Sequence, residues 1–338
     1  MSHCYLVYGL EVECSSPIEA LQCAPSDSRK IAMHYEDGPE PPWAHALLSR
    51  PRKIIRRRPD PAEGAELSFV LTQLGEEEGF ELAYSDGARF VADGAALRLW
   101  GTFEPPLAAE DLIVYLLGPV MGFLLRRRRI TCLHSSAVEF QGRAICLCGE
   151  AGFGKSTTAA AFALRGLPVT AEDIVPLEEE HGEFLAVPGY PRVCLWPESV
   201  KMLMGSEDAL PLITPGWEKR YLALDGRRAK FAGEKLPLAL VYVFAPRAGG
   251  ANAPRIEALS AREAMLELVR NTYMNWVIGS EQRAAEFDTL CRLVDRVEVR
   301  RVVPHERAEK IGELCDLILR DAEVFLSATK NSTEPVRR

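Results

Sequence analysis

Hydrophobic and polar residues follow two different patterns along the chain. Over residues 1–105, short apolar runs are broken repeatedly by turn-forming glycine, proline and aspartate residues, which is typical of strands joined by turns. The segment FELAYSDGARFVADG (80–94) predicts a β-hairpin with Asp86-Gly87 as its turn. From residue 130 the pattern changes to strands, loops and helices in alternation.

A long apolar stretch lies between these two regions. Residues 105–129 carry acids at the start and four arginines at the end, which is the order that a helix dipole favours. The stretch therefore predicts a mainly helical connection.

Several elements are predicted after residue 130. LHSSAVEF (133–140) and RAICLC (143–148) are strand-like and are joined by a tight turn at Gln141-Gly142. KSTTAAAFALR (155–165) predicts a helix that stops at Gly166, and VTAED (169–173) predicts a short strand that ends on two acids. Further strands are expected at LALVYVFAP and RIEAL, and further helices near 261–275 and 306–325.

These elements predict an α/β protein with two domains. We expect a smaller β-rich N-terminal domain over 1–105, a connecting helix over 106–129, an α/β domain over 130–325 and a flexible tail over 326–338. A chain of 338 residues with 47% hydrophobic content is long enough for two domains and a sizeable core.

Charge and composition exclude some classes of function. The net charge of −8 disfavours general nucleic-acid binding. The longest apolar run, 112–125, is shorter than the ~20 residues needed to span a bilayer, and the N-terminus lacks a signal-peptide pattern. The nine cysteines include no C-x-x-C pair, and Cys146 and Cys148 are expected to be small apolar residues on one strand face. We expect a soluble cytoplasmic protein with no membrane or nucleic-acid partner.

A glycine-rich loop carries the strongest chemical signal. Gly149–Ser156 reads GEAGFGKS and fits G-x-x-x-x-G-K-[ST], in which backbone N–H groups and the following helix N-terminus hold phosphate oxygens. Lys155 can reach the β- and γ-phosphates, and the Ser156 hydroxyl can ligate Mg²⁺. We expect ATP and Mg²⁺ as cofactors. The predicted nucleotide-binding residues are Gly149, Glu150, Ala151, Gly152, Phe153, Gly154, Lys155, Ser156 and Thr157.

The acid pair should lie beside the same phosphates. A helix of about 11 residues runs back roughly 16 Å alongside the sheet, and the short strand then returns parallel to the first. Both strand ends therefore emerge at the edge where α/β sheets bind ligands. Neighbouring strand residues point to opposite faces. One of Glu172 and Asp173 is expected to hold Mg²⁺ and the other to take a proton from the acceptor.

A histidine is placed near the loop by strand register. A two-residue turn at Gln141-Gly142 pairs Phe140 with Arg143, and counting back along both strands pairs His134 with Gly149. An imidazole there could contact phosphate, or position or polarise an acid, and the register leaves these roles open.

The acid doublet favours a kinase over a large mechanical ATPase, whose metal-binding strand is usually a long apolar run ending in one acid. One carboxylate can bind metal while the other serves as base. Two alternatives stay open: a nucleotide-binding regulatory protein without transfer activity, and a small-molecule kinase.

Residues 133–177 resemble the bacterial HPr serine kinase family. The shared features are a histidine opening the strand before the loop, the G-x-x-G-x-G-K-S loop, a helix closed by Arg-Gly, and an acid pair. The likeness covers roughly 105–325. It continues through GYPRVCLWPES, KRYLAL, LPLALVYVF and NTYMNW, which look closer to the HPr-kinase-like proteins of lasso-peptide biosynthesis, which phosphorylate a serine on the peptide precursor.

The resemblance implies an HPr-kinase-like P-loop fold for the C-terminal domain. It implies transfer of the γ-phosphate of ATP to a serine hydroxyl of a peptide or small protein. Glu172 falls at the family's general-base aspartate, Asp173 at its metal-ligand aspartate, and His134 at its active-site histidine. Members of the family assemble into hexamers, so a homo-oligomer is an open expectation.

The chain departs from that family in two places. Glu172 is one methylene longer than the family aspartate, and no segment matches the glycine-rich segment that HPr kinases use near HPr. The second departure argues against HPr itself as acceptor and against the reverse phosphorylase reaction. Three further cations, Arg192, Lys219 and Arg220, are either contacts for phosphate or acceptor or strand-edge charges.

Overall fold

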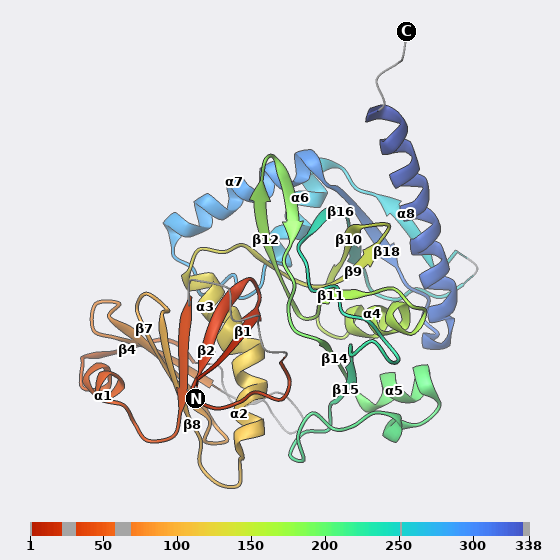
Figure 1. Cartoon of the computed structure of the whole chain (residues 1–338). Coiled ribbons are helices and arrows are strands. Elements are labelled where there is room, and N and C mark those ends of the chain that lie inside the picture. Colours follow the sequence, from red (N-terminus) through yellow and green to blue (C-terminus); the bar gives the residue numbers. More distant parts are fainter. Residues whose placement is uncertain (1, 22–31, 58–68, 251, 334–338) are drawn as a thin grey trace. The chain divides into compact units, whose positions relative to one another are not determined.

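The structure is a computed structural model that describes residues 2–21, 32–57, 69–250 and 252–333 (Figure 1). It divides into two compact units, Met1–Ile130 with Thr214–Gly216, and Thr131–Ile213 with Trp217–Arg338. The stretch predicted as a connecting helix over 106–129 belongs to the first unit.

The first unit is built on a sheet of eight strands among the described residues. Its hairpin over 80–94 is confirmed, since Ala83 pairs with Arg89 around the Asp86-Gly87 turn. The sheet order is β1 (His3–Val7), β2 (Leu10–Cys14), β3 (Met33–Asp37), β8 (Arg98–Thr102), β7 (Arg89–Asp93), β6 (Gly79–Tyr84), β5 (Phe69–Leu74) and β4 (Arg52–Arg57), and helix α1 (Pro42–Leu48) packs on it.

The predicted helical stretch before the second unit is confirmed but is not one straight helix. It consists of α2 (Ala109–Tyr115), a π-helical turn η1 (Leu116–Val120) and α3 (Met121–Arg127), with a kink at Gly118. No helix in the described part of the chain is both long and apolar enough to cross a membrane.

The second unit contains a mostly closed sheet. Its order is β10 (Arg143–Gly149), β9 (Cys132–Phe140), β12 (Ile174–Glu180), β13 (Glu183–Ala186), β16 (Leu236–Phe244), β18 (Glu298–Val303) and β17 (Arg255–Ala258), with β11 (Val169–Ala171) paired to β9. Because β10 also pairs with β16, the path β10-β9-β12-β13-β16 closes on itself. A separate ribbon is formed by β14 (Arg192–Leu195) and β15 (Arg220–Ala223).

Strand direction determines where the site can form. β10 runs parallel to β16, and β16 runs parallel to β18, so the loops after all three strands emerge at one edge. β11 is antiparallel to β9, which is antiparallel to β10. β11 therefore shares the direction of β10, as predicted, but β9 lies between them.

The predicted register of the β9–β10 hairpin is confirmed. Phe140 pairs with Arg143, and the ladder continues to Ser135 and Cys148. Gln141 and Gly142 both have positive φ, 54° and 77°, as a two-residue hairpin turn requires. His134 lies one residue beyond this ladder and pairs with Ile174 of β12 on its other side.

Helices cover both faces of the central strands. One core joins Ile145 and Leu147 of β10 to α4 (Lys155–Leu164) and α8 (Ile311–Thr333). The other core joins Cys146 and Cys148 to α6 (Ala261–Arg270) and α7 (Ser280–Arg296). The two cysteines therefore lie together on one apolar strand face, as predicted, and the chain is a mixed α/β protein.

Three helices were not predicted, namely α1, α5 (Pro197–Met204) and α7, and α8 extends to Thr333, past the predicted start of the tail at 326. α5 is short and buries only Val200, and α7 is largely polar, so both give a weak periodic signal. α8 continues to Thr333 because Ala322, Phe325 and Leu326 extend its apolar face against the core. Residues 334–338 of the predicted tail lie outside the described residues.

Candidate functional site

The glycine-rich loop connects β10 to α4. Gly149, Gly152 and Gly154 have φ values of 145°, 84° and 101°, a region that side chains with a Cβ rarely adopt. A Cβ on Gly149 would also lie 3.0 Å from the Cβ of Phe244. The loop shape therefore depends on glycine, and α4 begins immediately after it at Lys155. Its first N–H groups face the loop, as a phosphate site needs.

Lys155 links the loop to the neighbouring strand. Its side chain is buried, and its Nζ donates to the carbonyl oxygens of Gly149 at 2.7 Å and Glu150 at 3.1 Å. The same ammonium lies 3.1 Å from Nε2 of His134. Burial lowers the pKa of Lys155, and the charges of nearby carboxylates oppose that shift.

The contacts of His134 define its tautomer. An ammonium group can only donate, so Nε2 of His134 accepts from Lys155 and Nδ1 carries the ring proton. Nδ1 lies 3.2 Å from Oδ1 of Asp173 and 3.2 Å from its carbonyl oxygen. The imidazole therefore bridges the loop lysine and the second acid of the pair.

Glu172 and Asp173 form a sharp corner between two strands. β11 ends at Ala171 and β12 begins at Ile174, whose N–H donates to the carbonyl of Glu172 at 2.8 Å. Asp173 has a φ of 66°, which is uncommon for a residue other than glycine. This corner directs the two neighbouring carboxylates to different partners.

The Glu172 carboxylate meets the start of α4. The Ser156 hydroxyl donates to Oε1 of Glu172 at 2.6 Å. One helix position further on, Oγ1 of Thr157 lies 2.9 Å from Oγ of Ser199 in α5. Both hydroxyls predicted to bind the nucleotide or its metal are thus held by hydrogen bonds at the helix N-terminus.

The two acids have opposite pKa shifts. Burial, followed by the charge of Asp173, raises the pKa of Glu172 to about 7 against the opposing hydrogen bond from Ser156. Burial also acts to raise the pKa of Asp173, but the hydrogen bond and electrostatic interaction with His134 and the charges of Lys219 and Lys155 outweigh it and hold that pKa below its usual value. Such a separated pair suits one proton acceptor and one permanently ionised group.

The three further cations divide into two groups. Lys219 lowers the pKa of both acids and lies 4.8 Å from the ring centroid of Trp196, which is 53% exposed. Arg192 stacks on Tyr221 at 4.0 Å. Arg220 instead contacts Asp208 and donates to the carbonyl of Leu210 at 2.8 Å. Of these three cations, Lys219 is the one whose charge acts on both Glu172 and Asp173.

The oxygen groups of the site fit magnesium held together with a nucleotide. Among the described residues there is no cluster of three or more His, Cys, Asp or Glu side chains that could hold a metal alone. Mg²⁺ commonly uses one or two carboxylates, phosphate oxygens and water. Ser156, Glu172 and Asp173 are the oxygen-bearing side chains of this site that would share such binding.

The sequence prediction missed Arg247 and His305. Arg247 follows β16 closely, and a Cβ on Gly154 would lie 3.3 Å from its Nη2. His305 follows β18 and accepts, through its carbonyl oxygen, a hydrogen bond from Arg247 at 3.3 Å. The sequence did contain a signal for them: Arg247 comes shortly after the strand-like run that forms β16, and His305 shortly after the run that forms β18. Residues that follow parallel strands lie at the edge of the sheet where ligands bind.

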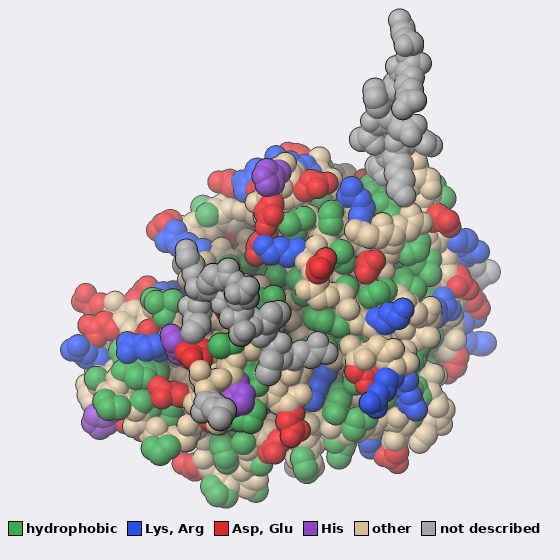
Figure 2. Space-filling view, viewed as in Figure 1, with side chains coloured by type: hydrophobic (Ala, Val, Ile, Leu, Met, Phe, Trp, Pro, Cys, Tyr) green, Lys and Arg blue, Asp and Glu red, His purple; other side chains and the backbone are tan. Residues whose placement is uncertain are grey.

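Surface charge is mixed on the face shown in Figure 2. Lysine and arginine side chains lie between aspartate and glutamate side chains there.

Comparisons with known proteins give no family assignment. No family model matches the chain, and no curated protein matches it. Among solved structures, the HPr(Ser) kinase/phosphatase from Coxiella burnetii is similar, with a TM-score of 0.33 and 15% identity over 60% of this chain and 95% of that chain. A likeness this weak carries no argument about function, which must rest on the geometry of the site.

The raised pKa of Glu172 predicts pH-dependent stability. Its pKa rises from an ordinary 4.5 to about 7 in the fold. The contribution of Glu172 to stability is therefore fully present below about pH 4.5 and is lost as the pH rises through about 7. Glu172→Gln removes the free-energy cost of ionising the buried carboxyl group at high pH. We expect it to raise the free energy of unfolding by about 1–3 kcal/mol at pH 8 and to change it little at pH 4.5, in urea denaturation at both values.

The control is Glu183→Gln, which changes an exposed glutamate in the same unit. An equal effect of Glu172→Gln at both pH values would contradict the raised pKa.

Proposed function

We propose that the protein is an ATP- and Mg²⁺-dependent kinase that phosphorylates a serine hydroxyl of a peptide or small protein. The observation that carries this proposal is the convergence of five side chains. Lys155 contacts the loop carbonyls and His134, His134 contacts Asp173, and Ser156 contacts Glu172. Phosphoryl transfer needs this combination of alignment and charge rather than a covalent intermediate.

The loop is the donor side of the site. Its backbone N–H groups and the N-terminus of α4 hold the phosphates of ATP, and Lys155 turns from the loop carbonyls to the β- and γ-phosphates. Ser156 and Asp173 would hold Mg²⁺, which would neutralise charge on the phosphates. The buried position of Lys155 supports this role, because a desolvated ammonium interacts strongly with phosphate.

The acid pair is the acceptor side. Glu172, with a pKa of about 7, suits a general base near neutral pH. It takes the proton of the serine hydroxyl, the serine oxygen forms a bond to the γ-phosphorus, and the bond from that phosphorus to the β,γ-bridging oxygen breaks to release ADP. Asp173, whose pKa is below its usual value, stays ionised and is the metal-binding carboxylate.

His134 is a positioning residue in this scheme. Its neutral ring accepts from Lys155 and donates toward Asp173, so it keeps the cation and the carboxylate at a fixed separation. The exposed Trp196 and neighbouring Lys219 offer a surface for the acceptor beside the acid pair. Sequence resemblance to the kinases of lasso-peptide biosynthesis favours a lasso-precursor-type peptide.

Removal of the loop lysine or the ionised acid should abolish transfer. We expect Lys155→Ala and Asp173→Asn each to lower the transfer of ³²P from ATP to a serine peptide by at least about 100-fold, because each removes charge needed at the transferred group. Lys201→Ala and Asp225→Asn are matched controls at exposed ion pairs and should leave the rate unchanged.

Full activity in either site variant would contradict the kinase assignment. A phosphorylated metabolite without phosphopeptide would indicate a small-molecule kinase. Tight ATP binding without turnover for any acceptor would indicate a nucleotide-dependent regulatory protein.

The two acids should be separable by pH and magnesium dependence. In the unsubstituted protein kcat is expected to rise with pH through about 7 as Glu172 ionises. Glu172→Gln should lower kcat and abolish that rise, whereas the residual activity of Asp173→Asn should keep the rise and need a higher Mg²⁺ concentration for half-maximal rate. If the rise of kcat with pH were lost in Asp173→Asn and kept in Glu172→Gln, Asp173 would be the general base and Glu172 the metal-binding carboxylate.

A further inference from the structure

The ribbon of β14 and β15 has one face in the core and one face that solvent reaches. On the core face, Val193 and Leu222 are 0% and 2% exposed and pack in the same cluster as α4. Side chains alternate along a strand, so Arg192, Cys194 and Tyr221 lie on the opposite face, where each is partly exposed. We call this second face the open face of the ribbon.

The open face carries an arginine with no carboxylate partner. The guanidinium carbon of Arg192 lies 4.0 Å from the ring centroid of Tyr221, and within the described residues no carboxylate is within ion-pair distance of Arg192. A guanidinium group stacked on a ring keeps the N–H groups at its edge available for a carboxylate. The stack also restricts the side chain, which lowers the entropy cost of binding.

The open face lies beside the acid pair. The Glu172 carboxylate accepts a hydrogen bond from the backbone of Cys194 in β14. Arg192 is two residues from Cys194 on the same face, which is about 7 Å along a strand. A peptide that lies extended along β14 with its serine at Glu172 therefore brings the side chain two residues from that serine to Arg192.

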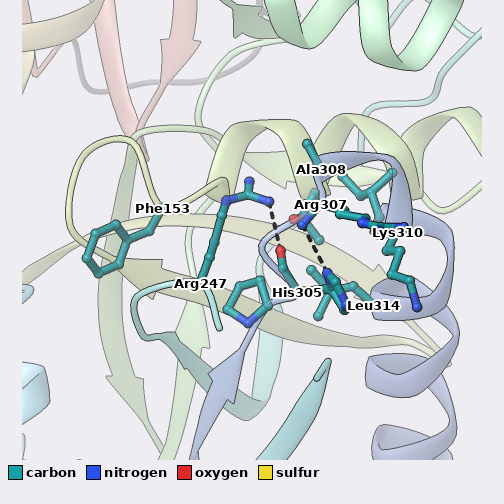
Figure 3. Close-up of a pocket in the computed structure, with 10 residues that line it drawn as sticks. Phe153, Arg247, His305, Arg307, Ala308, Lys310 and Leu314 are labelled. Atoms are coloured by element: carbon teal, nitrogen blue, oxygen red, sulfur yellow. Dashed lines mark hydrogen bonds between the residues drawn. The ribbon is translucent and has the colours of Figure 1, made fainter. Parts of the chain in front are cut away.

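The other cations near the site have different partners. The charge of Lys219 acts on both carboxylates of the acid pair, and Arg220 is paired with Asp208. Arg247 follows β16, whereas the acids follow β11, which is reached from β10 through β9. Nη1 of Arg247 donates to the carbonyl oxygen of His305 at 3.3 Å, as Figure 3 shows. Of these arginines and lysines, Arg192 is the one placed to meet an acceptor.

We propose that Arg192 selects acceptor peptides that carry an aspartate or glutamate two residues from the phosphorylated serine. The peptide lies extended along β14, its serine hydroxyl is at Glu172, and the guanidinium group of Arg192 binds its acidic side chain. Arg192 is a specificity-determining residue, because it contacts the acceptor away from the reacting atoms. This inference rests on the proposed function and names the class of peptide that the same site takes.

Transfer of ³²P from ATP to a set of serine peptides tests the proposal. The peptides are otherwise neutral, have amidated C-termini, and carry Asp or Asn two residues before or two residues after the serine. The direction of the peptide along β14 decides which position is read. At one of the two positions, kcat/KM should be about tenfold higher with Asp than with Asn, as for a charge-assisted hydrogen bond. Arg192→Gln should remove this preference.

A charge exchange separates recognition from a structural effect. Arg192→Glu should prefer Lys to Asp at the same peptide position, and a variant that is merely damaged cannot gain activity toward a new peptide. Arg227→Gln, at an exposed arginine elsewhere in the same unit, is the matched control and should keep the preference for Asp. The KM for ATP should change by less than about twofold in Arg192→Gln.

Three results would overturn the inference. They are equal rates with Asp and Asn at both positions, a preference for Asp that persists in Arg192→Gln, and a higher KM for ATP in Arg192→Gln with the preference kept, which would make Arg192 a phosphate contact. Failure of the unsubstituted protein to phosphorylate any serine peptide would instead contradict the proposed function.

Discussion

The buried ammonium group of Lys155 is the interaction on which the candidate site depends. It contacts two loop carbonyls and the ring of His134, so one charge joins the glycine loop to the neighbouring strand. A buried cation is costly unless it is paired or hydrogen-bonded. The same contact determines the histidine tautomer, and through it the hydrogen bond to Asp173. Loop, imidazole and acid are therefore one coupled unit.

The second constraint is the two-residue corner between β11 and β12. Because Glu172 is buried and lies next to the Asp173 carboxylate, the two acids cannot both ionise freely. The corner gives one of them the Ser156 hydroxyl and the other the imidazole. Different partners separate the two pKa values, and one short segment can thus supply both a proton acceptor and a permanent negative charge.

The local parts of the fold were readable from the sequence. The turn at Gln141-Gly142 determined the β9–β10 register, and the glycine loop with its helix followed from residue pattern alone. Arg247 and His305 could not be placed in this way, because they follow β16 and β18, whose positions depend on pairings between residues about 95 apart (β10 with β16) and about 58 apart (β16 with β18) in sequence. α7 was missed because most of its residues are polar. The end of α8 was missed because polar residues follow the last apolar contacts of the helix with the core, at Ala322 and Phe325.

The central claim is that the glycine loop and the acid pair act on one triphosphate. A crystal structure with Mg²⁺ and a non-hydrolysable ATP analogue tests it most directly. The account predicts β- and γ-phosphates within hydrogen-bonding distance of Lys155 and the loop N–H groups, with the γ end beside Glu172 and Asp173. An analogue bound elsewhere, or a γ-phosphate that points away from both carboxylates, would contradict it.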